Sequence, residues 1–203
     1  YNNFPQSINL YGNNTIEAIP ETGYEFAYWE YTGEYISSTE NNAASIDIFS
    51  NSSLTAHFTK IELEVIFDIS HYDGGVINFN NEELTDLPIT KTVYYGDVNT
   101  IEIVLNENFL FNNWQSNSTT IPTINAESIN LSFTENDSIF AQLNKLLSLT
   151  IKVEPVNAGT VYGNGEELLL TPNSQIYLEN TPIYIEAVAD LNMEFESIAR
   201  GQA

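Results

Sequence analysis

The amino-acid sequence predicts an all-β protein, built from tandem β-sandwich or β-grasp-like modules of about 85 residues in an elongated array. Residues that favour strands are plentiful, with 12 Tyr, 11 Phe and recurrent Ile, Val and Thr. Landmarks also recur along the chain at a spacing of about 85 residues, and internal repetition of this kind indicates a modular architecture. Hydrophobic residues make up 42% of the chain, which is enough for packed cores.

The two tryptophans mark the repeat. Residues 23–29 (GYEFAYW) resemble residues 108–114 (NFLFNNW), and residues 53–60 align with residues 138–145 at the same shift of 85. A third copy follows at a shift of 84, in which Ile198 stands where the tryptophan would be. We therefore expect a partial repeat over 1–60, a complete repeat over 61–145 and a partial repeat over 146–203.

Alternating apolar residues bounded by turn signals predict the strands inside the repeats. In the complete copy they span 62–67, 76–79, 91–95, 100–105, 109–115, 128–133 and 138–143. In the third copy they span 149–153, 159–162, 175–178 and 183–189. Residues 143–149 are predicted as a short helical link between these copies.

The charge balance excludes two classes of partner. Five Lys and Arg against 28 Asp and Glu give a net charge of −23, which repels phosphate backbones and anionic lipids. We expect no nucleic-acid binding and no membrane insertion, since no run of about 18 apolar residues occurs. The acidity has two interpretations: solubility through self-repulsion, or clustered carboxylates that bind divalent cations. The absence of cysteine excludes disulfides and thiolate chemistry.

The order of motifs resembles that of the divergent internalin-type B-repeats, which occur in tandem in large bacterial surface proteins. Four residues of the tryptophan motif and four of the closing strand carry the resemblance in the first copy: Gly23, Tyr24, Phe26, Trp29, Leu54, Thr55, Ala56 and Phe58. The resemblance implies a secreted or cell-surface adhesin. The composition, rich in Asn, Ile, Glu and Ser and poor in Arg, is similar to that of gliding-motility adhesins of flavobacterium-like bacteria.

Aromatic residues divide into expected core and candidate ligand contacts. We predict a structural core made of Phe26, Trp29, Phe58, Phe111, Trp114 and Phe195, because a bulky indole usually fills a small sandwich. Exposed tyrosines are the candidates for glycan contact, and they are Tyr28, Tyr31, Tyr94 and Tyr95. Strand alternation places Tyr28 and Trp29 on opposite faces and Tyr31 on the tryptophan side.

No combination of residues predicts a catalytic or metal centre. His57 and His71 are the only histidines and do not recur between copies, so we expect neither a zinc site nor a catalytic triad. Residues 68–75, with two aspartates before a Gly-Gly turn, are the candidate calcium loop, but their spacing fits an ordinary hairpin turn better. The recurring pairs Glu82-Glu83 and Glu166-Glu167 are interpreted as solvated turns. We expect no cofactor.

Together these observations predict a non-enzymatic, monomeric stalk or adhesive segment of a large extracellular protein. It would act by spacing and by weak multivalent contact with a surface polysaccharide or other adhesion target, beside adjacent repeats of the same protein. The alternative is a carbohydrate-binding accessory region of a secreted polysaccharide-degrading enzyme. The start at Tyr1, without an initiator methionine, leads us to expect an internal segment of a longer protein.

Overall fold

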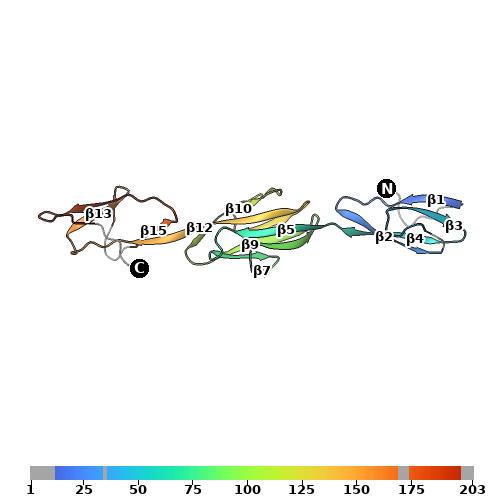
Figure 1. The fold of residues 1–203 in the computed structure, drawn as a ribbon, viewed down its shortest axis with the longest axis horizontal. Helices are drawn as coiled ribbons and strands as arrows, with labels where there is room; N and C mark the ends of the chain where they lie inside the picture. Colours follow the sequence, from blue (N-terminus) through green and yellow to red (C-terminus); the bar gives the residue numbers. More distant parts are fainter. Residues whose placement is uncertain (1–11, 34–35, 169–173, 198–203) are drawn as a thin grey trace.

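The computed structural model describes residues 12–33, 36–168 and 174–197. These residues form β-strands and no helix, so the predicted all-β class is confirmed. Three groups of strands follow one another along the long axis of the molecule (Figure 1). None of the described segments is a helix that could cross a membrane.

The middle module is a two-layer β-sandwich. Its strands are β5 (Glu62–Ile69), β6 (Gly75–Phe79), β7 (Glu82–Leu84), β8 (Ile89–Tyr94), β9 (Val98–Leu105), β10 (Phe109–Ser116), β11 (Ser128–Ser132) and the first part of β12 (Asp137–Thr150). One sheet has the order β10-β12-β5-β8 and the other β11-β9-β6-β7. Strands β5 and β12 pair in parallel, and every other pair in the module is antiparallel.

Apolar residues of both sheets meet between the layers of the middle module. Phe67, Phe133 and Trp114 are among the largest fully buried side chains, together with Ile77 and Ile101. Strand β5 shows why the sequence folds this way: its buried and exposed residues alternate, so one face enters the core while the glutamates face water. Of the two predicted alternatives, the sandwich is the one that the structure has.

The first group repeats the second half of the middle module. Its strands are β1 (Gly12–Glu17), β2 (Tyr24–Thr32), β3 (Ala43–Ile48) and β4 (Ser53–Lys60). The pairs β1–β3 and β2–β4 have the register of β9–β11 and β10–β12, one repeat earlier. Even the β-bulge recurs, between Phe26 and Tyr28 and between Phe111 and Asn113. The predicted repeat is therefore present in the backbone.

The third group repeats the first half of the middle module. Its strands are β13 (Gly159–Gly163), β14 (Glu166–Glu167), β15 (Ser174–Leu178) and β16 (Ile185–Ala189). The order β14-β13-β16 matches β7-β6-β9 at a shift of 84. Strand β15 pairs with the end of β12, as β8 pairs with β5.

Short connections without loops join the groups. Strand β12 runs to Thr150, pairing first with β10 and β5 and then, over residues 146–150, with β15. The predicted helical link over 143–149 is wrong, because β12 pairs with β10 up to Lys145 and with β15 from Leu146 onward, and both partners supply hydrogen bonds to an extended backbone. Only Ile61 separates β4 from β5 at the other connection. We call the two connections, around Ile61 and Leu146, the first and second junctions.

Candidate functional site

The two tryptophans lie in their cores and anchor a connection between strands. The exposed fraction is 1% for Trp114 and 8% for Trp29. Each indole Nε1 donates to a main-chain oxygen 12 residues later, in Ala126 at 2.8 Å and in Asn41 at 2.9 Å. These side chains are therefore enclosed by their own loops, which leaves no open indole face for a sugar.

The phenylalanines of the predicted core divide into two classes. Phe26 and Phe111 are half-buried, with ring centroids 5.4 and 5.2 Å from those of the neighbouring tryptophans. Phe58 and Phe195 differ from the prediction, because 40% and 55% of their surface is exposed. Leu143, at the position of Phe58 in the middle module, is 1% exposed because β5 and the second sheet pack beside it. Ile198, which stands at the tryptophan position of the third copy, lies outside the described residues.

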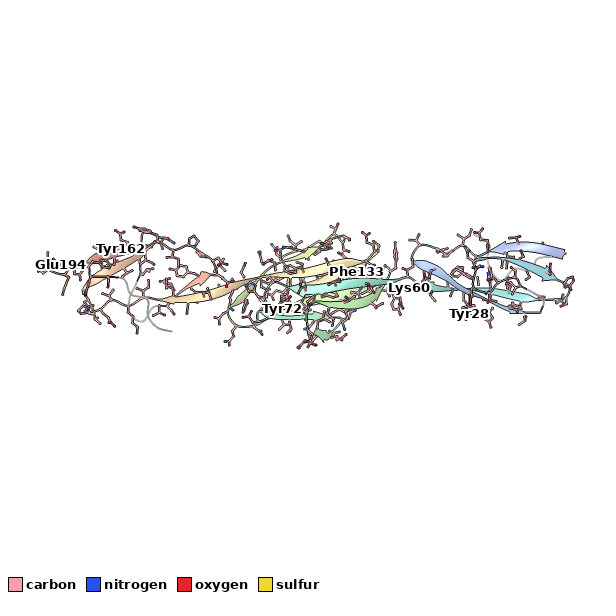
Figure 2. All side chains as sticks on the ribbon, in the orientation of Figure 1. Tyr28, Lys60, Tyr72, Phe133, Tyr162 and Glu194 are labelled. Carbon is pink, nitrogen blue, oxygen red and sulfur yellow. The ribbon has the colours of Figure 1, made fainter. Side chains whose placement is uncertain are left out.

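The candidate glycan-binding tyrosines do not form one surface. Tyr28 lies exposed on β2 (Figure 2). Its ring is stacked on that of His57, with the ring centroids 4.5 Å apart and an interplanar angle of 12°. The Nε2 atom of His57 also lies 2.8 Å from a carboxylate oxygen of Glu30. Tyr31 is exposed too, but it stands on the Trp29 side of the strand, opposite Leu54. No common platform for a sugar therefore arises from the two residues.

The other two tyrosines lie near the first junction, and they have different surroundings. Tyr94 is exposed at the end of β8. Tyr95 packs against the core, and its main-chain N–H donates to the carbonyl of Ile61 at 3.0 Å. Its ring covers Gly23 of the first group so closely that a Cβ there would lie 2.5 Å from Cδ1. Tyr95 is thus a packing residue between two modules and not an open ligand contact.

An ion pair reinforces the first junction. Lys60, at the end of β4, donates to the carboxylate of Asp97 in the turn after β8. This hydrogen bond raises the pKa of Lys60 above its ordinary value. The N–H of Ile61 donates to the carbonyl of Gly23 at 3.0 Å, so side chains and main chain both connect the groups here.

The second junction repeats this main-chain pattern. The N–H of Leu146 donates to the carbonyl of Asn108 at 2.7 Å. The N–H of Glu179 donates to the main-chain carbonyl of Lys145 at 2.8 Å. These are the Ile61–Gly23 and Tyr95–Ile61 bonds, one repeat later. The side chain of Lys145 lies 2.7 Å from Asp73, and this bond raises the pKa of the lysine and lowers that of the aspartate.

A further contact crosses the second junction. The Nε2 atom of His71 lies 3.1 Å from a carboxylate oxygen of Glu179, which follows β15. An open groove of about 530 Å³ lies alongside, lined by Lys145, Leu147, Ile176 and others. The histidines thus serve as hydrogen-bond partners of glutamates in separate groups, and the structure does not bring them together.

The acidic residues of the described segments do not gather into a cation site. None of these segments contains three or more His, Asp or Glu side chains placed to hold a metal ion. Asp73 of the candidate calcium loop instead faces Lys145. The pairs predicted as turns, Glu82-Glu83 and Glu166-Glu167, lie in the short strands β7 and β14.

Sequence reasoning missed Asp137, a buried carboxylate at the start of β12. Its oxygens accept hydrogen bonds from the Ser116 hydroxyl at 2.7 Å and from the main-chain N–H groups of residues 117–119 and Ser138. Burial alone raises the pKa of Asp137, but the bonds from Ser116 and Thr119 outweigh it and hold the pKa below its ordinary value. No local signal distinguishes this aspartate from the others.

The fold and the junctions define a tandem-repeat β-sandwich protein. Residues 8–62 match the model of the divergent InlB B-repeat domain family. The matched segment contains β1–β4, whose counterparts one repeat later are β9–β12. This part of the chain is therefore similar to a bacterial B-repeat module. No curated protein and no solved structure matches the chain.

Proposed function

We propose that the chain is a non-catalytic stalk segment of a bacterial surface protein, which holds other parts of that protein at a distance. One observation carries the proposal: neither junction contains a flexible linker, because β12 runs from the middle module into the third group and only Ile61 separates β4 from β5. A junction made of paired strands restricts bending, whereas a Gly/Ser linker would behave as a coil. The similarity of residues 8–62 to B-repeat domains supports a place at the cell surface.

The net charge of −23 fits this role, because like charges along a rod oppose collapse and association. Weak contacts with a surface polysaccharide would add adhesion through repetition of the modules. The four candidate tyrosines form no common surface, so spacing is the primary role and adhesion the secondary one.

Stiffness at the first junction provides the test. Spin labels on Thr55→Cys and Glu102→Cys would flank the junction on exposed positions, and the chain has no cysteine of its own. We expect a narrow distribution of distances by pulsed electron resonance. A Gly-Ser insertion between Lys60 and Ile61 should broaden it, whereas the same insertion between Asn51 and Ser52, in a loop of the first group, should not.

A broad distribution in the unmodified chain would contradict the stalk. The location is tested separately: antibodies against the chain should label intact cells of the source bacterium. Labelling that appears only after the cells are broken would contradict a surface role.

A further inference from the structure

The chain enters and leaves the middle module on neighbouring strands. It enters through Ile61 into β5 and leaves along β12 toward the third group. The two strands pair in parallel from Val65 opposite Asp137 to Ile69 opposite Ala141. The remaining strands of the module, β6 to β11, lie between them in the chain and therefore off the direct path between the two junctions.

The parallel orientation decides how tension would act on this pair. Tension along the array pulls the start of β5 toward the first group and the end of β12 toward the third group (Figure 1). The two strands would then slide past each other along their axes. Hydrogen bonds between parallel strands lie across that direction, so several are loaded together instead of one after another.

Side chains extend the pairing at both ends. At one end, Oδ1 of Asn136 accepts the main-chain N–H of Glu64 at 2.9 Å. At the other end, the main-chain N–H of Ser70 donates to the carbonyl of Ala141 at 3.0 Å. The Oγ atom of Ser70 accepts a hydrogen bond from the N–H of Leu143 at 2.8 Å. Asn51 occupies the place of Asn136 one repeat earlier, so the first of these residues recurs.

The core protects these bonds from water. Val65, Phe67, Ile139 and Ala141, which point inward from the two strands, are all buried. Water that competes for main-chain groups therefore reaches the pair only from the outer face, and a hydrogen bond in a dry environment is stronger than one in water.

We propose that the β5–β12 pair, with Asn136 and Ser70 at its ends, is a mechanical clamp through which the module carries tension along the array. The proposal rests on the stalk function and adds force resistance to it. Off-path strands supply the core that keeps the clamp together, and they carry no direct load.

The test pulls the same protein in two directions by single-molecule force spectroscopy. Handles on Glu62→Cys and Ser148→Cys load the pair in shear, because they lie at opposite ends of it. Handles on Glu62→Cys and Glu135→Cys lie at the same end and peel the strands apart. We expect the unfolding force in shear to be about two-fold or more higher, because peeling breaks one hydrogen bond at a time.

Single substitutions separate the clamp from general stability. Ser70→Ala should shorten the lifetime under constant shear force about five-fold, the rate equivalent of roughly one net hydrogen bond. Thr100→Val is the matched control, since it removes one 2.8 Å side-chain bond to Asn130 between off-path strands. It should leave the shear lifetime nearly unchanged.

Equal forces in the two directions, or equal effects of the two substitutions in shear, would overturn the clamp. The experiments distinguish failure of the clamp from failure of the stalk. A chain with a narrow junction distance and equal forces would keep the stalk and lose the clamp. A chain with flexible junctions and a high shear force would keep the clamp and lose the stalk.

Discussion

At the scale of single residues, the buried carboxylate of the middle module connects two distant pieces of chain. Asp137 brings the start of β12 to residues 116–119, and it does so through its negative charge. Hydrogen bonds to a charged group are stronger than those between neutral groups, and a buried charge that loses them is costly. Asp137 should therefore contribute more to stability than the exposed acids around it.

Asp137→Asn tests this contribution. The amide nitrogen cannot accept the N–H groups that the second carboxylate oxygen accepts, so we expect a loss of about 2 kcal/mol in the free energy of unfolding at pH 7. The measurement is urea unfolding followed by tryptophan fluorescence in a Trp29→Phe background, where Trp114 alone reports on the middle module. Glu135→Gln, at an exposed position, is the control and should change little.

The pKa of Asp137 also sets the sign of the pH dependence. Because the folded pKa lies below the unfolded value of about 3.9, the stabilisation is fully present above that pH and is lost as the pH falls through the folded pKa. The difference between the native protein and Asp137→Asn should therefore be constant near neutral pH and shrink in acid. A difference that grows in acid would contradict this role.

At the scale of elements, the first junction depends on close contact between a turn and an aromatic ring. Gly23 has a φ of +85° and lies under the ring of Tyr95. Asn108 has the same left-handed conformation at the second junction, but Glu179 replaces the tyrosine there. The first junction therefore needs glycine for two reasons, conformation and space, and the second needs only the conformation.

Gly23→Ala separates these two reasons. A Cβ would collide with Tyr95 and would also strain the backbone, so we expect a loss of more than the roughly 1 kcal/mol that a left-handed alanine costs. Gly165→Ala is the matched control, with the same φ of +85° and nothing within 4 Å of the added Cβ. Thermal unfolding measures both. Equal losses in the two variants would show that Tyr95 does not restrict this position.

At the scale of the whole molecule, repulsion between acids opposes every packed state of the chain. The net charge is −23, and the lysines of the described residues that form ion pairs are half-buried but paired with largely exposed carboxylates, so each pair contributes little. Screening should then relieve more repulsion than it removes attraction.

Added sodium chloride should accordingly raise the midpoint of thermal unfolding. Calcium chloride at the same ionic strength should raise it equally, because the described residues contain no cluster of acids suited to a metal ion. Scanning calorimetry with a chelator arm checks both statements. A larger shift with calcium would reveal a site, since a ligand that binds only the folded state stabilises it in proportion to its occupancy.

The sequence by itself determined the strand class, the repeat and the burial of the tryptophans. Each follows from a feature that can be read along the chain: the alternation along β5, the shift of 85 residues between Trp29 and Trp114, and the size of an indole. The sequence wrongly predicted a helical link at 143–149, because an apolar run of that length suits either a helix or a strand. The strands that pair with β12 determine that this segment is extended.

Only the tertiary structure decided which residues from distant segments meet, within a module and between modules. Tyr95 is paired with Gly23, Asp137 with Ser116, and Ser70 with Leu143, and each pair joins segments distant in the chain. The same holds for the parallel pairing of β5 with β12, which makes neighbours of the strands at the two ends of the module. The alternation of apolar and polar residues indicates whether a side chain is buried or exposed. Which residue it contacts depends on how the two sheets of the sandwich pack together.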